Sequence, residues 1–96
     1  GPVHPDTARA LADGARTRCG ADWGIGLTGV AGPTEQDGVP VGTVHLGISG
    51  PSGATVTTLH LDGDRAAVRR GAVDAALREL GARVSANREP SGPAPR

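Results

Sequence analysis

Three stretches of the chain alternate apolar residues with polar or small ones. They cover residues 23–28, 43–49 and 55–61, and a period of two is typical of a strand with one buried face. The turn-forming sequence Gly50-Pro51-Ser52-Gly53 separates the second stretch from the third, which predicts a hairpin. In the second stretch Val44, Leu46 and Ile48 are expected on one face and His45 on the other.

Two further stretches space apolar residues for a helix. The first begins near Pro5, ends at Gly20 and carries a stripe of mostly small residues that suits close approach to a sheet. This stripe consists of Ala8, Leu11, Ala12, Ala15 and Cys19. The second begins after Asp64, a residue suited to capping free amides, and runs to Val84. The polar, proline-containing residues 85–96 are expected to form a disordered tail.

Two features of the sequence point to a binding site. The glycine-rich turn after Thr28 offers backbone amides to an anion or to a developing oxyanion. The start of the last helix combines free amides with Arg65 and Arg69, where cations oppose the helix dipole and a bound anion would relieve the mismatch. Both features also fit a structure without a ligand, since strand-to-loop glycines and solvated arginines on a capped helix are common.

Composition narrows the class of protein. The 96 residues have a net charge of zero, with no lysine, so no overall field attracts nucleic acid or a membrane surface. Cys19 is the single cysteine, which excludes an internal disulfide, and we expect it to pack on the first helix rather than to bind metal. No apolar run approaches the length of a membrane span. We therefore expect a cytoplasmic protein without a metal, a cofactor or a nucleic-acid partner.

The predicted core is light, and the histidines carry little signal. One Trp is present, with no Phe, Tyr or Met, so few large side chains can be buried. We therefore expect the isolated chain to be only marginally stable. His45 and His60 each stand alone on a strand. That position is more typical of a surface or packing residue than of a catalytic base.

Three blocks of the sequence resemble a known family. In order they are ADWGIGLTGVAGP, PVGTVHLGISG and LDGDRAAVRRGAVDAAL, and together they resemble the C-terminal domain family of competence/damage-inducible protein A (CinA) over most of residues 2–80. The resemblance implies an α/β fold. It implies part of a three-layer α/β/α domain with a mixed sheet, ordered helix-strand-strand-strand-helix and occupying residues 1–84.

The resemblance also implies a reaction and a site. Active members of the family are nicotinamide mononucleotide amidohydrolases, which convert nicotinamide mononucleotide and water to nicotinate mononucleotide and ammonia. No metal or other cofactor is implied. The residues that match the family's nucleotide pocket are Thr28, Gly29, Ala31, Gly32, Arg65 and Arg69.

The sequence departs from the family pattern at its start. The block that carries the proposed catalytic serine is absent, and we expect Ser49, Ser52, Ser85 and Ser91 in turns or in the tail, where they match no motif. We therefore expect a domain truncated on its N-terminal side, with substrate-positioning groups but no catalytic residue. A non-catalytic nucleotide-binding or assembly module is the alternative. Missing strands would leave an open sheet edge, so a homo-oligomer is expected.

Overall fold

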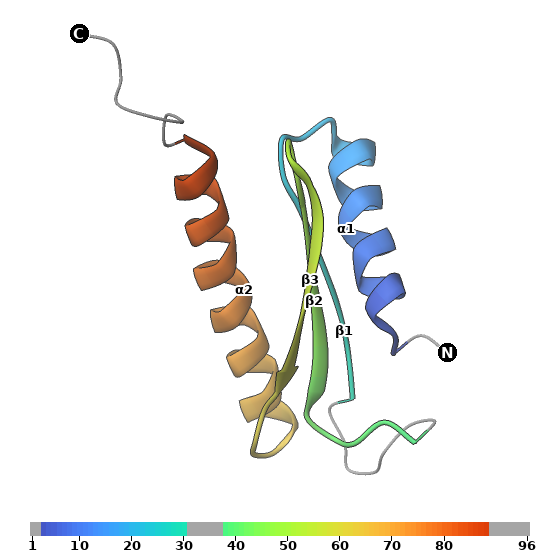
Figure 1. Cartoon of the computed structure of the whole chain (residues 1–96). Helices are drawn as coiled ribbons and strands as arrows, with labels where there is room; N and C mark the ends of the chain where they lie inside the picture. The colour runs from blue at the N-terminus through green and yellow to red at the C-terminus, as the bar shows by residue number, and fades with distance from the viewer. Residues whose placement is uncertain (1–2, 31–37, 89–96) are drawn as a thin grey trace, which may run out of the picture.

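Two helices enclose a three-stranded sheet in the computed structural model, which describes residues 3–30 and 38–88 (Figure 1). The helices lie on opposite faces of the sheet, giving the layers α/β/α (Figure 1). The predicted fold class and the order of elements are confirmed. In chain order the elements are α1 (Pro5–Cys19), β1 (Gly24–Gly29), β2 (Thr43–Gly50), β3 (Gly53–His60) and α2 (Arg65–Arg88).

The described sheet is an antiparallel meander with β2 at its centre. β1 pairs with β2 in the register Ile25 opposite Ile48, and β2 pairs with β3 in the register Gly47 opposite Val56. The predicted hairpin between β2 and β3 is confirmed, with Gly50 opposite Gly53. All pairing in the described sheet is antiparallel, so the parallel strands of the mixed sheet that the resemblance implies are not among the described residues.

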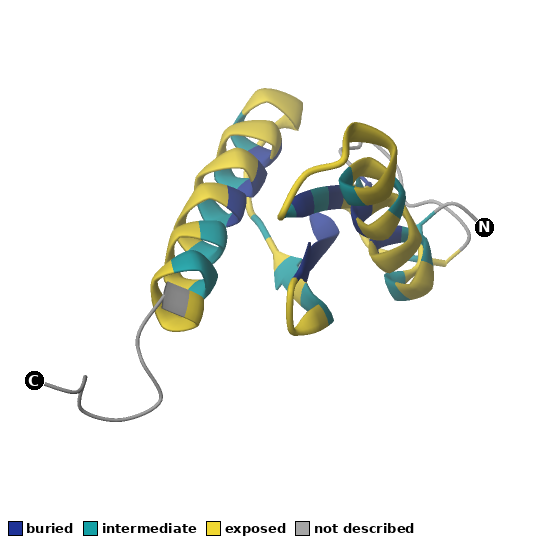
Figure 2. Cartoon of the chain, turned by 90° about the horizontal axis from the view of Figure 1, so that it is seen from above, coloured by how far each residue is buried: buried dark blue, intermediate teal, exposed yellow. Residues whose placement is uncertain are grey.

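The apolar face of β2 packs against α2. Val44 lies in a cluster with Val68 and Ala72 of α2, and Leu46 and Ile48 lie in a second cluster with Ala76. Leu59 and Leu61 support the first cluster, and Trp23, Ile25 and Leu80 support the second. Figure 2 shows the buried residues of α2 along the side that faces the sheet. The core contains few large side chains, as the composition predicts, and alanines fill part of it.

The other face of β2 is also buried, which corrects the expectation of a half-exposed strand. This face carries Gly47 and meets α1, and every residue of β2 is buried. A side chain added at Gly26 or Gly47 would overlap the carbonyl oxygen of Ala8. The absence of side chains at these glycines is therefore what allows α1 to lie directly on the sheet.

The contact of α1 is narrower than its apolar stripe predicted. Ala8 and Ala12 are buried, whereas Leu11, Ala15 and Cys19 are exposed. The expectation that Cys19 packs on the helix face is wrong. Because the glycines bring α1 so close to the sheet, the two alanines fill the centre of the contact, and Leu11 lies at its margin beside Gly26.

The ends of the helices follow their local sequence. α1 ends at Gly20, whose φ of 60° is the left-handed conformation that glycine adopts readily. Asp64 caps α2, since its Oδ1 accepts a hydrogen bond from the backbone N–H of Ala67 at 2.8 Å. α2 continues to Arg88, so residues 85–88 of the expected tail are helical. Residues 89–96 lie outside the described part of the chain.

Neither helix suits a lipid bilayer. Within residues 3–30 and 38–88, no helix is both long enough and apolar enough to span a membrane.

Candidate functional site

One end of the sheet brings together the elements that carry the predicted site. The backbone N–H of Gly42 donates to the carbonyl of Val30 at 2.7 Å, and the N–H of Leu61 donates to the carbonyl of Gly42 at 2.8 Å. These bonds tie the segments after β1 and β3 to the segment before β2. α2 begins at the same end, at the bottom of Figure 1. The end of β1, with Thr28, and the start of α2, with Arg65, therefore share one end of the sheet, although the Thr28 side chain lies on the face that α1 covers and α2 lies on the other face.

The predicted site residues occupy the ends of two elements. Thr28 and Gly29 are the last two residues of β1. Arg65 is the first residue of α2 and Arg69 lies about one turn later, and both arginines are exposed. The remaining two predicted residues, Ala31 and Gly32, lie outside the described residues.

The hydroxyl group of Thr28 is buried and unusual. Its Oγ1, like that of Thr43, has no hydrogen-bond partner among the described residues. Thr28 lies opposite His45, and Thr43 precedes His45 by two positions, so both threonines share one face of the sheet. Buried hydroxyls in proteins are usually hydrogen-bonded, so each of these two oxygens is still able to form a hydrogen bond with a further group.

His45 forms the centre of a polar row that crosses the sheet on this face. Thr28 of β1 and Thr58 of β3 both lie opposite His45, and the Nδ1 of His45 is 2.9 Å from the Oγ1 of Thr58. Burial lowers the pKa of His45 below its usual 6.5, and the nearby His4 and His60 lower it further. These effects all favour the neutral form of His45.

The sequence interpretation placed His45 on a surface or in packing, and did not identify this row. His45 is only 8% exposed, whereas His60 is exposed. The missing information was the register of three strands, because no spacing within the chain connects Thr28, His45 and Thr58. The alternation of each strand would have revealed their shared face once the pairing was known.

The start of α2 has the features of an anion seat. Its first turn contains no acidic side chain beyond the capping Asp64, and Arg65 and Arg69 bring positive charge to the positive end of the helix dipole. A phosphate group at this position would accept hydrogen bonds from backbone N–H groups and from guanidinium groups.

The serines that the structure describes provide no exposed nucleophile at this end. Ser49 belongs to β2 rather than to a turn, is 1% exposed, and donates a 2.6 Å hydrogen bond to Asp13 of α1. Ser52 lies at the opposite end, in the turn between β2 and β3, and Ser85 lies in α2 rather than in a disordered tail. Ser91 is outside the described residues. Among the described residues, no three His, Cys, Asp or Glu side chains gather as metal ligands.

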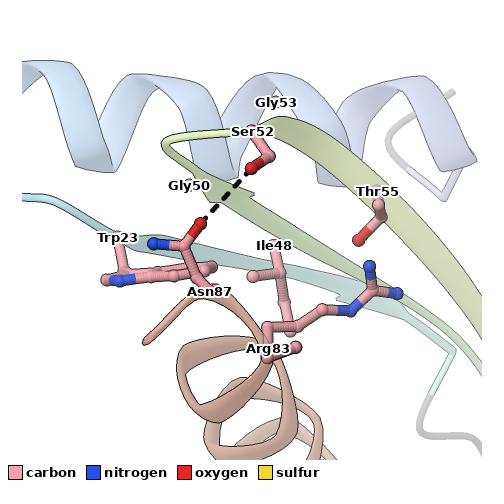
Figure 3. Close-up of a pocket in the computed structure, with 9 residues that line it drawn as sticks. Trp23, Ile48, Gly50, Ser52, Gly53, Thr55, Arg83 and Asn87 are labelled. Carbon is pink, nitrogen blue, oxygen red and sulfur yellow. Dashed lines mark hydrogen bonds between the residues drawn. The ribbon is translucent and has the colours of Figure 1, made fainter. Parts of the chain in front are cut away.

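A hollow of about 430 Å³ opens at the opposite end, between α2 and the turn that joins β2 to β3 (Figure 3). Trp23 and Arg83 are among its lining residues, and none of the predicted site residues is. Three of its polar side chains already have partners: Arg83 donates to Glu79 at 3.1 Å, and Ser52 donates to Asn87 at 3.3 Å. This hollow is therefore separate from the candidate site.

Comparison with known proteins defines the family. The profile of the CinA C-terminal domain matches residues 1–84. The chain belongs to the CinA C-terminal domain family. The match explains why the order of elements and the three recognisable blocks occur together.

Curated relatives of this CinA-family chain include two CinA-like proteins. One, from Frankia casuarinae, is 48% identical over 77 residues, which is 80% of this chain and 18% of the relative. The other, from Anaeromyxobacter dehalogenans, is 51% identical over 81 residues, which is 83% of this chain and 20% of the relative. The chain thus spans about a fifth of the length of these relatives.

Solved CinA superfamily structures share the fold. A protein from Klebsiella pneumoniae is 30% identical, with a TM-score of 0.82 over 88% of this chain and 53% of that chain. A protein from Escherichia coli is 35% identical, with a TM-score of 0.78 over 82% of this chain and 46% of that chain. The chain corresponds to about half of each solved structure.

Proposed function

We propose that this chain supplies the substrate-positioning part of a nicotinamide mononucleotide amidohydrolase. In the proposed reaction, a water oxygen becomes bonded to the carboxamide carbon of nicotinamide mononucleotide, the bond from that carbon to nitrogen breaks, and ammonia leaves. The product is nicotinate mononucleotide. The attacking serine, or a serine that binds the water, would come from outside these 96 residues.

The roles of the proposed binding residues follow from their chemistry. Arg65, with Arg69 beside it, would hold the phosphate group at the start of α2, where N–H groups and cations both favour an anion. Thr28 and Gly29 would contact the remainder of the nucleotide at the end of β1. Ala31 and Gly32 belong to the same proposed pocket by their match to the family motif.

One observation carries the proposal: β1 and α2 present their candidate residues at the same end of the sheet, linked through Gly42 by two backbone hydrogen bonds. The chain places about 35 residues between the two elements, yet the topology returns it to one place. The buried hydroxyl of Thr28, without a partner among the described residues, is at this end too, but on the face of the sheet that α1 covers.

Ammonia release from nicotinamide mononucleotide tests the absence of a nucleophile. The purified chain is expected to release none above a no-protein control. Turnover by the chain alone would contradict the claim that the reacting group lies elsewhere.

A chimera tests the positioning role directly. Residues 1–84 would replace the matched segment of the Anaeromyxobacter dehalogenans relative, and ammonia release would be measured as a function of substrate concentration. Arg65→Ala should lower kcat/KM by about tenfold or more, because a charged hydrogen bond is worth roughly 1.5–3 kcal/mol. Arg78→Ala, which removes another exposed arginine of α2, is the matched control and should leave kcat/KM unchanged. Equal effects of the two substitutions would contradict the role of Arg65.

The second candidate function is a non-catalytic nucleotide-binding or assembly module. Its support is the set of apolar side chains left exposed on both helices and on β1, which suits an assembly surface. An active chimera would count against this alternative. A chimera that binds nicotinamide mononucleotide without releasing ammonia would favour it.

Cytoplasmic location and homo-oligomer formation complete the proposal. Both rest on the sequence. Fractionation of cells tests the location, and light scattering of the purified chain tests the oligomeric state.

A further inference from the structure

The hollow between the last turns of α2 and the β2–β3 turn combines an aromatic ring with several polar side chains (Figure 3). Its volume of about 430 Å³ falls in the range of roughly 300–1,000 Å³ that small-molecule sites occupy. Trp23 and Ile48 are apolar lining residues, and the polar lining residues include Thr55, Arg83 and Asn87. An apolar wall with a few polar groups is typical of a site for a small molecule.

Trp23 is anchored beside the hollow before any ligand arrives. A Cβ at Gly50 would lie 2.6 Å from Cε3 of Trp23, so the absence of a side chain at this glycine makes room for the ring. The ring also packs against the core cluster of Leu46, Ile48 and Ala76. It is nevertheless only partly buried and lines the hollow. A ring that the fold already holds in place lowers the cost of ordering the site on binding.

The polar groups that α2 contributes keep unused hydrogen-bond donors. Nε and Nη2 of Arg83 donate to Oε1 of Glu79 at 3.2 and 3.1 Å, which leaves Nη1 without a partner among the described residues. Oδ1 of Asn87 accepts the 3.3 Å hydrogen bond of Ser52, which leaves the amide N–H groups of Asn87 available. Asn87 follows Arg83 by four positions, so both lie on one side of α2. α2 therefore offers donors to a ligand in the hollow.

The charges around the hollow disfavour a strongly anionic ligand. Glu79 pairs with Arg83 and offsets its charge. The hollow also lies at the C-terminal end of α2, which is the negative end of the helix dipole. A phosphate group is therefore poorly suited to this site, whereas an uncharged carbonyl oxygen suits the free donors of Arg83 and Asn87.

We infer that this hollow binds a flat, uncharged heteroaromatic ring that carries carbonyl oxygens. The ring lies against Trp23, and Arg83 and Asn87 donate hydrogen bonds to its carbonyl oxygens. Two aromatic rings in contact gain more than their buried area alone supplies, which favours an aromatic ligand over an aliphatic one of the same size. The inference uses no residue of the proposed nucleotide pocket, so it does not depend on the proposed function.

The fluorescence of Trp23 tests the inference directly. Trp23 is the single tryptophan and the chain contains no tyrosine, so the intrinsic emission comes from the wall of the hollow. The probe is uridine, whose ring is flat and uncharged and carries carbonyl oxygens. Titrated into the full 96-residue chain, uridine should change the emission saturably, with a Kd of about 1 mM or below. Dihydrouridine keeps the carbonyl oxygens but lacks the aromatic ring, and it should bind about threefold more weakly or worse.

Matched variants test the donors of α2. Asn87→Asp keeps an oxygen that accepts the hydrogen bond of Ser52 but removes the N–H donors, so it should weaken uridine binding by about tenfold. Ser85→Asp places the same charge two positions earlier in α2, outside the lining of the hollow, and should leave the affinity unchanged. Both positions are exposed, so neither substitution should unfold the chain, and circular dichroism would verify this.

Several results would overturn the inference. One is a change in emission that does not saturate, or no change at all. Others are equal affinities for uridine and dihydrouridine, and equal effects of Asn87→Asp and Ser85→Asp. Loss of uridine binding in Arg65→Ala would place the ligand at the opposite end of the sheet and would also overturn it.

Discussion

Ser49 of β2 donates a 2.6 Å hydrogen bond to Asp13 of α1, and this bond joins two layers of the fold. Ser49 is 1% exposed, whereas Asp13 is exposed. Removing each partner should therefore change the free energy of unfolding by a different amount. Water can replace the serine hydroxyl at the exposed Asp13, but it cannot replace the carboxylate at the buried Ser49.

Removing the carboxylate should destabilise the chain more than removing the hydroxyl. Ser49→Ala should lower the free energy of unfolding by about 0.5–1.5 kcal/mol, and Asp13→Ala by about 1–3 kcal/mol because it leaves a buried hydroxyl unsatisfied. Urea titrations of both variants and of the double variant give the values and their coupling. A larger loss in Ser49→Ala than in Asp13→Ala would contradict this reading of the bond.

Gly26 should not tolerate even a methyl group. A Cβ at this position would lie 2.6 Å from the backbone nitrogen of Ala12, so α1 would have to move away from the sheet. Gly26→Ala should lower the free energy of unfolding by about 1–3 kcal/mol. Gly14→Ala is the matched control, because a Cβ at Gly14 of α1 meets nothing within 4 Å. It should be neutral or stabilising by up to about 1 kcal/mol, and a similar loss in both variants would contradict the close contact.

Acidification should destabilise the fold through His45. Its pKa is lowered in the folded chain, so the unfolded chain binds more protons between that lowered value and the ordinary 6.5. The free energy of unfolding should therefore fall as the pH drops through and below about 6.5. The contribution of His45 is present in full above that pH. Urea titrations between pH 5 and 8 measure this trend.

The variant His45→Gln should remove part of the pH dependence, because glutamine does not titrate. His60→Gln removes only the smallest of the three causes that lower the pKa of His45, so it should change the pH dependence much less than His45→Gln does. An identical pH dependence in the chain and in His45→Gln would show that another group is responsible.

The sequence was sufficient for the elements because each is encoded locally. The alternation around Leu46 identified β2 and its apolar face, and the start at Pro5 and the stop at Gly20 identified α1. The sequence did not predict how exposed Leu11 and Cys19 are, because their exposure depends on how closely α1 packs on the glycines of the sheet. Periodicity gives the direction of a side chain but not the distance to the layer beneath it.

The candidate site was predictable in part. The motif matches indicated Thr28 and Arg65, and the topology brings the ends of their elements to one end of the sheet. The polar row with His45 required the register of three strands, which no local pattern contains. Two of the four serine interpretations were wrong: Ser49 is the next-to-last residue of β2, and Ser85 lies in α2. Ser52 does lie in a turn, as expected.

The most direct test of the account is a calorimetric titration of the chain with nicotinamide mononucleotide and with nicotinamide riboside, which lacks the phosphate group. If the start of α2 and the end of β1 hold a phosphorylated ligand, the mononucleotide should bind at least tenfold more tightly than the riboside. Arg65→Ala should abolish that difference, and Arg78→Ala should preserve it. Equal affinity for the two ligands, or no binding of the mononucleotide at millimolar concentration, would contradict the account.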